Sequence, residues 1–109
     1  MKTRPFEYTP ERSGLSFRCE GCRGFHSIIT SGPDAWGWNG DRDAPVFTPS
    51  VLVVHNNAKG RHVCHSFVGC NGAQPGEIIY LSDCTHHLAG QVRPLLTFDE
   101  ATPTLGGNL

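Results

Sequence analysis

Two cysteines separated by two residues are the clearest chemical signal in the sequence. Cys19 and Cys22 lie in the segment Cys-Glu-Gly-Cys-Arg-Gly, and such a pair wraps one side of a tetrahedral zinc ion, with each sulfur about 2.3 Å from the metal. Gly21 and Gly24 allow the positive φ angles that a tight turn requires. A redox role would place a helix after the first cysteine, whereas the strand-like run 25–30 follows. The spacing predicts a zinc knuckle, and two unligated thiols in a surface turn are the alternative.

A tetrahedral site needs two more ligands, and the sequence has no second closely spaced cysteine pair to supply them. The remaining candidates are His26, His62, Cys64, His65, Cys70, Cys84, His86 and His87. We favour Cys64 and His86, which would make the metal tie three distant chain segments together. His26 is the main rival for the fourth position, because it follows the knuckle closely enough to fold back onto the same ion.

Strand geometry separates two adjacent candidates, Cys64 and His65. Residues 61–68 are expected to form a strand, in which successive side chains point to opposite faces. The two residues should therefore not bind the same ion. Val63 and Phe67 share a face with His65, which predicts that His65 points inward, either as a hydrogen-bonded core residue or as a ligand.

The run 83–87 is the other dense patch of candidate ligands. Cys84 and His86 can both turn toward one metal there; alternatively, Thr85 caps a helical turn and the histidines are solvated. Cys70 is expected to be incidental, in a hairpin loop. The remaining two histidines, His55 and His62, flank a turn and are expected to face solvent.

A small β fold must position these residues. The chain has 109 residues, with 13 Gly and 8 Pro, which predicts one domain with many turns. Six β-like runs are separated by turn residues: 15–19, 25–30, 46–55, 61–68, 77–81 and 91–98. Pro49 makes its run either an edge strand or a bent one, and 85–89 is expected to form one short helical turn. We expect a mostly β sandwich or partly open barrel, ordered over about 14–98, with flexible tails that include a lead-in arm at 1–13.

Charge and composition limit the classes of partner and the cellular location that we expect. The net charge is -1 and the arginines are scattered, which argues against a nucleic-acid backbone as a partner. A single-stranded nucleic-acid binder that stacks bases on Trp36, Trp38 and Phe47 is the weakest interpretation. No run is apolar enough to span a membrane, no signal peptide is visible, and five cysteines do not make a complete disulfide framework. We therefore expect a cytoplasmic protein.

Several motifs occur in order over about residues 15–96. They are Cys19-x-x-Cys22 with His26, Trp36-Gly37-Trp38-Asn39-Gly40-Asp41, Phe47-Thr48-Pro49-Ser50, Cys64-His65-Ser66-Phe67-Val68 and the run from Leu81 to Gln91. Together they resemble a phage and prophage family of unknown function whose members often carry the label "ammonia monooxygenase". That label does not fit a chain that cannot enter a membrane. The resemblance implies a phage-encoded or prophage-encoded accessory protein, and a phage-encoded one would act in the host cytoplasm. The positions it makes prominent are Cys19, Cys22, His26, Cys64, His65 and His86, whereas Cys84 and His87 fall where the family tolerates other residues.

Two functions compete. The leading hypothesis is a zinc-stabilised binding module that acts on a host protein, and antagonism of a host defence system is an analogy only. Trp36 and Trp38 are either core anchors or part of its recognition surface. The competing hypothesis is a metal-dependent hydrolase, with Cys64, His65 and His86 as ligands and Asp83 or Asp41 as general base. The sequence carries no His-Glu-x-x-His motif and no zinc-deaminase motif, which favours the binding module.

Overall fold

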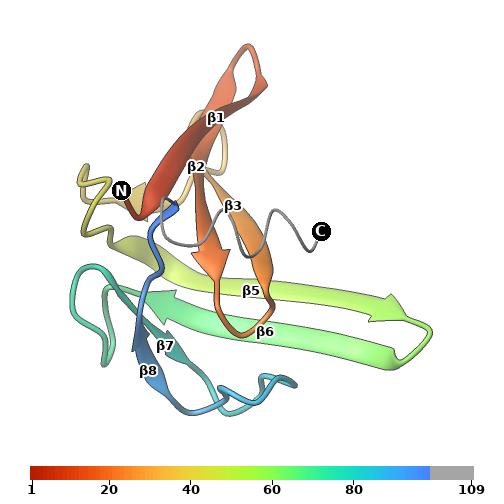
Figure 1. Ribbon diagram of the computed structural model, residues 1–109. Helices are drawn as coiled ribbons and strands as arrows, with labels where there is room; N and C mark the ends of the chain where they lie inside the picture. Colours follow the sequence, from red (N-terminus) through yellow and green to blue (C-terminus); the bar gives the residue numbers. More distant parts are fainter. Residues whose placement is uncertain (99–109) are drawn as a thin grey trace.

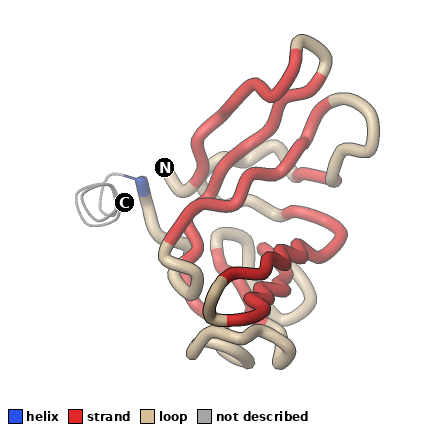
Figure 2. Tube along the Cα trace, turned by 90° about the vertical axis from the view of Figure 1, so that its right-hand side faces the viewer, coloured by secondary structure: helices blue, strands red, loops and turns tan. Residues whose placement is uncertain are grey.

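Two antiparallel sheets make up the computed structural model, which describes residues 1–98 (Figures 1 and 2). Within that range the strands are β1 (Thr3–Thr9), β2 (Arg12–Cys19), β3 (Gly24–Ser31), β4 (Gly37–Trp38), β5 (Phe47–Asn57), β6 (Gly60–Val68), β7 (Glu77–Tyr80) and β8 (Val92–Pro94). The order is β1-β2-β3 in one sheet and β4-β5-β6-β7-β8 in the other. The predicted mostly β single domain is confirmed, and every predicted run overlaps a strand.

The first sheet includes a strand where a lead-in arm was expected. β1 pairs with β2 from Thr3 opposite Phe17 to Thr9 opposite Arg12. Pro5 lies within β1, and this is tolerated because β1 is an edge strand, where a missing N–H costs no ladder hydrogen bond. The arm is therefore part of the fold. The expected C-terminal tail, 99–109, lies outside the described residues.

The second sheet is dominated by the long hairpin of β5 and β6. Near its start, β5 advances from Phe47 to Val51 while β6 moves back only from Val68 to Ser66. The extra residues of β5 form a bulge that contains Pro49 and Ser50. The predicted bend at Pro49 is therefore present, and such bulges re-aim side chains beside functional sites.

The core lies between the two sheets, whose strands cross (Figure 1). Phe17 of β2 is fully buried and stacks on Phe47 of β5, with 6.1 Å between the ring centroids. Further core side chains are Leu15, Ile28, Val51, Val68, Ile78, Tyr80, Leu88 and Leu95. The core is small, so each large apolar side chain in it carries a sizeable share of the stability.

The predicted helical turn at 85–89 is wrong. These residues form bends and turns between β7 and β8. Thr85 was expected to cap a helix, but its backbone N–H donates to the Val63 carbonyl, 2.9 Å away, and its hydroxyl accepts from the Val63 N–H. Thr85 therefore pairs with the backbone of β6 and does not cap a helix. Within residues 1–98, no helix is long and apolar enough to cross a membrane.

Truncation of the central aromatic side chain tests the packing. Phe17→Ala should lower the free energy of unfolding by about 3–5 kcal/mol, because it removes buried apolar area and leaves a cavity between the sheets. Tyr8→Ala, at a position that is 66% exposed, is the control and should change it by less than about 0.5 kcal/mol. Urea unfolding with zinc present measures both. Equal effects of the two variants would contradict this placement of the core.

Candidate functional site

Four of the predicted metal ligands come together between the two sheets. The ligand atoms of Cys19, Cys22, Cys64 and His86 all lie within 4.8 Å of one another. Cys19 ends β2, Cys22 is in the turn to β3, Cys64 is in β6 and His86 is in the loop after β7. Two of the four are buried and two are half-buried. The cluster therefore joins the three chain segments that the sequence suggested.

The spacing within this cluster suits a tetrahedral ion. With sulfurs at about 2.3 Å and a nitrogen at about 2.0–2.1 Å from zinc, tetrahedral angles place two sulfurs about 3.8 Å apart and a sulfur and a nitrogen about 3.6 Å apart. Cys19 Sγ lies 3.8 Å from Cys64 Sγ, and His86 Nε2 lies 3.4 Å from Cys64 Sγ. Four protein ligands leave no open coordination position, as in structural zinc sites.

The knuckle turn is built differently from the expectation about its glycines. The Cys22 N–H donates to Cys19 Sγ at 3.3 Å, and the Arg23 N–H donates to the Cys19 carbonyl at 2.8 Å. The positive φ, 58°, falls on Arg23 and not on Gly21 or Gly24. Gly21 is needed for space instead, because a Cβ at this position would collide with the His86 imidazole ring.

The thiols of the cluster share their protons unequally. Hydrogen bonds from Cys22 and Cys64 to the Cys19 sulfur hold the pKa of Cys19 well below its usual range. The hydrogen bond to Cys19 raises the pKa of Cys22 to about 12, and it also raises the pKa of Cys64. Burial lowers the pKa of His86, which favours the neutral imidazole that a metal ligand must be. Because metal ligands must be deprotonated, a divalent cation would take the place of the thiol protons.

The Tyr80 hydroxyl and the His62 ring contact the cluster without belonging to it. The Tyr80 hydroxyl lies 3.4 Å from Cys19 Sγ and accepts from the Gly21 N–H at 3.3 Å. His62 Nε2 lies 3.2 Å from Cys22 Sγ. The expectation that His62 faces solvent is therefore wrong, since its ring is half-buried against the knuckle. Such outer contacts orient metal ligands.

The structure does not place His26 in the cluster. Its ring packs edge-on against Phe17, with 5.5 Å between the centroids, and it is 8% exposed. Its Nε2 has no hydrogen-bond partner within the described part of the chain. His26 therefore lies beside the knuckle but outside the group of four side chains, which contains His86.

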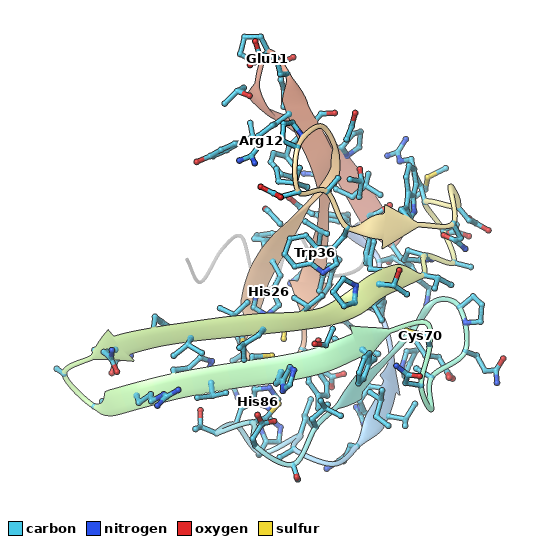
Figure 3. All side chains as sticks on the ribbon, turned by 180° about the vertical axis from the view of Figure 1, so that it is seen from behind. Glu11, Arg12, His26, Trp36, Cys70 and His86 are labelled. Carbon is cyan, nitrogen blue, oxygen red and sulfur yellow. The ribbon has the colours of Figure 1, made fainter. Side chains whose placement is uncertain are left out.

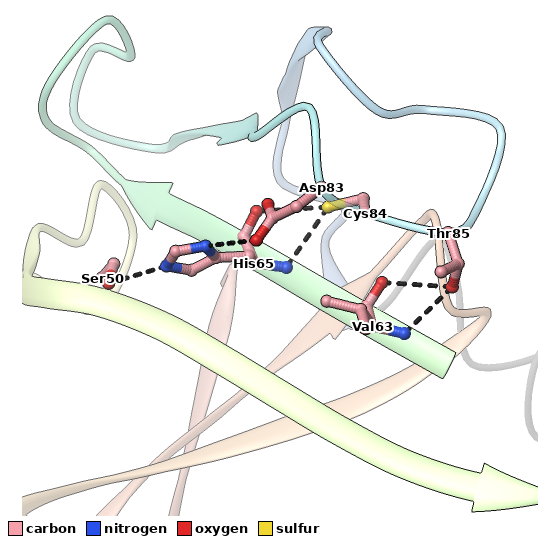
Figure 4. Close-up of polar contacts among 6 residues, drawn as sticks. All are labelled: Ser50, Val63, His65, Asp83, Cys84 and Thr85. Atoms are coloured by element: carbon pink, nitrogen blue, oxygen red, sulfur yellow. Dashed lines mark hydrogen bonds and ion pairs between the residues drawn. The ribbon is translucent and has the colours of Figure 1, made fainter. Parts of the chain in front are cut away.

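His65 belongs to a separate group of side chains on the opposite face of β6. Its Nε2 lies 3.1 Å from Ser50 Oγ, and its Nδ1 lies 3.0 Å from Asp83 Oδ2 (Figure 4). The expectation that His65 points into the core is wrong, because 26% of its side chain is exposed. A serine, a histidine and a carboxylate linked in this order have the arrangement of a nucleophile, its general base and the group that orients the base.

Backbone contacts hold each member of this triad in place. Ser50 lies in the β5 bulge, and its carbonyl accepts from the Trp36 indole N–H at 3.3 Å. The His65 N–H donates to Cys84 Sγ, and the Cys84 thiol donates to the His65 carbonyl, both at 3.2 Å. Cys84 is thus not a member of the metal cluster. Its contacts fix the loop that carries Asp83 against β6 (Figure 4).

The other candidates lie apart from both groups. The Cys70 thiol, in the loop after β6, donates to the Phe47 carbonyl at 3.6 Å, and His87 is exposed. The Asp41 carboxylate accepts from the backbone N–H groups of Asp43 and Ala44. Asp41 therefore stabilises its own loop and does not act as a base beside the metal cluster.

Sequence reasoning missed Ser50. The sequence shows it only as the last residue of Thr-Pro-Ser, within a run that already contains a proline. The available signal was that proline, because a bulge in a strand opposite a histidine-containing strand can aim a hydroxyl at the imidazole. Asp83 was considered only as a base for a metal-dependent reaction.

Comparison with known proteins identifies one family. The family model described as bacterial ubiquitination-like system serine protease (BubE) matches residues 2–75. The matched range includes Ser50, His65 and three of the clustered cysteines, and it ends before Asp83 and His86. No curated protein and no solved structure matches the chain. The phage family that the motifs resemble finds no support in these comparisons, and the chain belongs to the family of bacterial ubiquitination-like system serine proteases (BubE).

Proposed function

We propose that this protein is a serine peptidase in which Ser50 is the nucleophile, His65 the general base and Asp83 the group that orients the base. The observation that carries the proposal is the hydrogen-bonded chain from Ser50 Oγ through the imidazole to the Asp83 carboxylate, at 3.1 and 3.0 Å. The description of the family as serine proteases supports the same chemistry. The same description names a ubiquitination-like system, which favours a protein component of such a system as the substrate.

In the proposed reaction, each side chain of the triad has one role. His65 Nε2 takes the proton from Ser50 Oγ as the oxygen attacks the carbonyl carbon of the scissile bond. The imidazolium then gives this proton to the leaving amine, and the acyl group stays on Ser50 until a water, deprotonated by His65, releases it. The Asp83 carboxylate accepts from Nδ1–H, which leaves Nε2 free to receive the proton and stabilises the charged ring.

We assign the metal cluster to a structural zinc ion. Three thiolates and one imidazole are ligands that zinc prefers, and a site with four protein ligands leaves no position for a reactive water. This argues against a metal-dependent hydrolase, because His65, one of its proposed ligands, bonds Ser50 and Asp83 instead, and Asp83 bonds His65.

One part of the binding-module hypothesis, the expectation of protein partners, agrees with this proposal. Protein partners fit a member of a ubiquitination-like system, and a host protein as target, a phage origin and a cytoplasmic location stay predictions. A hydrogen-bonded triad on a partly exposed face favours catalysis over binding alone, because a binding surface does not require a serine aligned with a histidine and a carboxylate.

Covalent labelling tests the nucleophile. A fluorophosphonate reagent should modify Ser50, located by mass spectrometry of the peptide, and Ser50→Ala should abolish labelling and lower hydrolysis of p-nitrophenyl acetate by about 10³-fold or more. Asp83→Asn should slow both reactions by about 10²–10⁴-fold while the fold is kept, because the wrong imidazole tautomer is then favoured. Ser82→Ala, at an exposed neighbour of Asp83, is the control. Equal labelling of the wild-type and Ser50→Ala proteins would refute the proposal.

Metal analysis tests the zinc site. The reduced protein should carry about one zinc per chain, and Cys64→Ser and His86→Ala should each lower zinc affinity steeply, since each removes one of four ligands. Cys70→Ser and His26→Ala should retain the metal, because neither side chain belongs to the cluster. Structural zinc contributes apparent binding energies of about 10–16 kcal/mol in small peptides, so chelation should unfold most of the chain, as followed by circular dichroism. A zinc-free protein with an unchanged melting temperature would contradict the assignment.

A further inference from the structure

The hydrogen-bonding pattern of β6 defines which groups of β5 face outward. The Val63 carbonyl accepts from the Thr85 N–H, and the His65 carbonyl accepts from the Leu81 N–H, each at 2.9 Å. These two residues of β6 thus direct their backbone groups away from β5. In an antiparallel pair, hydrogen-bonded and non-hydrogen-bonded positions alternate. The residues opposite them, Leu52 and Val54, therefore direct their own N–H and C=O groups away from β6.

No strand covers those outward groups within residues 1–98. β4 pairs with β5 only at Phe47 and Thr48, and the rest of that edge runs from the bulge to Asn57. Figures 1 and 3 show the far half of the β5–β6 hairpin projecting beyond the other strands. A long open edge is a template for pairing with another chain.

Both faces beside this edge suit the alternating side chains of an added strand. On the face that carries the triad, Leu52 is 56% exposed and Val54 is 41% exposed. On the other face a pocket of about 470 Å³ is lined by Phe25 of β3 and by Val53 and His55 of β5, among others. An extended peptide along the edge would place successive side chains alternately on the apolar pair and over the pocket.

The open edge leads to the nucleophile. Leu52 lies two residues beyond Ser50 and pairs with His65, so the first outward-facing amide adjoins the triad. At Ser50 itself, the Trp36 indole N–H occupies the carbonyl, which ends the open edge at that residue. A strand paired with the edge would therefore bring its end to Ser50 Oγ.

We infer that the substrate binds as an extended strand that adds to the free edge of β5, with main-chain hydrogen bonds to Leu52 and Val54 and with one end at Ser50. This inference rests on the proposed peptidase function. Peptides that add a strand to an open sheet edge gain affinity from main-chain hydrogen bonds and specificity from pockets for alternate side chains. The occupant is an unfolded segment or tail of a protein. The edge itself selects no particular folded surface, because its amides recognise only extended backbone.

A proline tests this pairing with little effect on the hairpin. Val54→Pro removes an N–H that faces the open edge and not β6, and proline is tolerated in edge strands at such positions. The matched control Val54→Ala keeps the N–H. The probe is an internally quenched mixture of twelve-residue peptides of randomised sequence, with p-nitrophenyl acetate as a small substrate that reaches Ser50 without the edge.

We expect Val54→Pro to lower kcat/KM on the peptide mixture by about tenfold or more relative to Val54→Ala, as one lost hydrogen bond and the steric block of the ring require. Hydrolysis of the small ester and fluorophosphonate labelling should be equal in the two variants, which shows that Ser50 is intact. Equal kcat/KM of the two variants on the peptides would overturn the inference, whereas a wild-type protein that hydrolyses the ester but cleaves no peptide would contradict the peptidase function and the inference with it. A wild-type protein that reacts with neither the ester nor the fluorophosphonate would refute the peptidase function, and the inference would fail with it.

Discussion

The alternation of side chains along β6 is the constraint on which both sites depend. Cys64 and His65 are neighbours in the chain, and a β-strand sends neighbouring side chains to opposite faces. Cys64 therefore lies in the cluster with Cys19, Cys22 and His86, whereas His65 lies on the outer face beside Ser50. One strand thus positions a candidate metal ligand and the proposed general base on opposite faces. A slip of one residue in the pairing of β6 would exchange their faces and destroy both sites at once.

The loop after β7 couples the two sites. It supplies Asp83 to the triad and, three residues later, His86 to the metal cluster. Thr85 lies between them and pairs with the backbone of β6. A zinc ion bound by His86 would hold this loop against β6 and so hold the Asp83 carboxylate at the imidazole. In the proposed enzyme, the metal would then act by holding Asp83 in position, without contacting the substrate.

The regular parts of the fold were readable from the sequence. Apolar, β-branched runs between turn residues predicted the strands that carry the core, and the Cys-x-x-Cys spacing predicted the knuckle turn. β1 was not predicted, because Pro5 and its charged neighbours make a weak alternation, and most side chains of this strand are exposed or half-buried. The face of His65 was also misjudged. Val63 and Phe67 looked like core residues, but the inner face of β6 is filled by Cys64, Ser66 and Val68.

The arrangement of Ser50, His65 and Asp83 was harder to predict from the sequence, because it arises from departures from regular structure. Ser50 reaches the imidazole because the register of β5 slips around Pro49, and no local pattern gives the direction of a bulged side chain. Asp83 comes from a loop whose backbone bonds to β6 where the sequence favoured a helix cap. Bulges interrupt a ladder and leave backbone groups without a strand partner. On the opposite side of β5, the pairing with β4 ends at Thr48 and the Trp36 indole N–H occupies the Ser50 carbonyl, so the open edge begins beside the same serine.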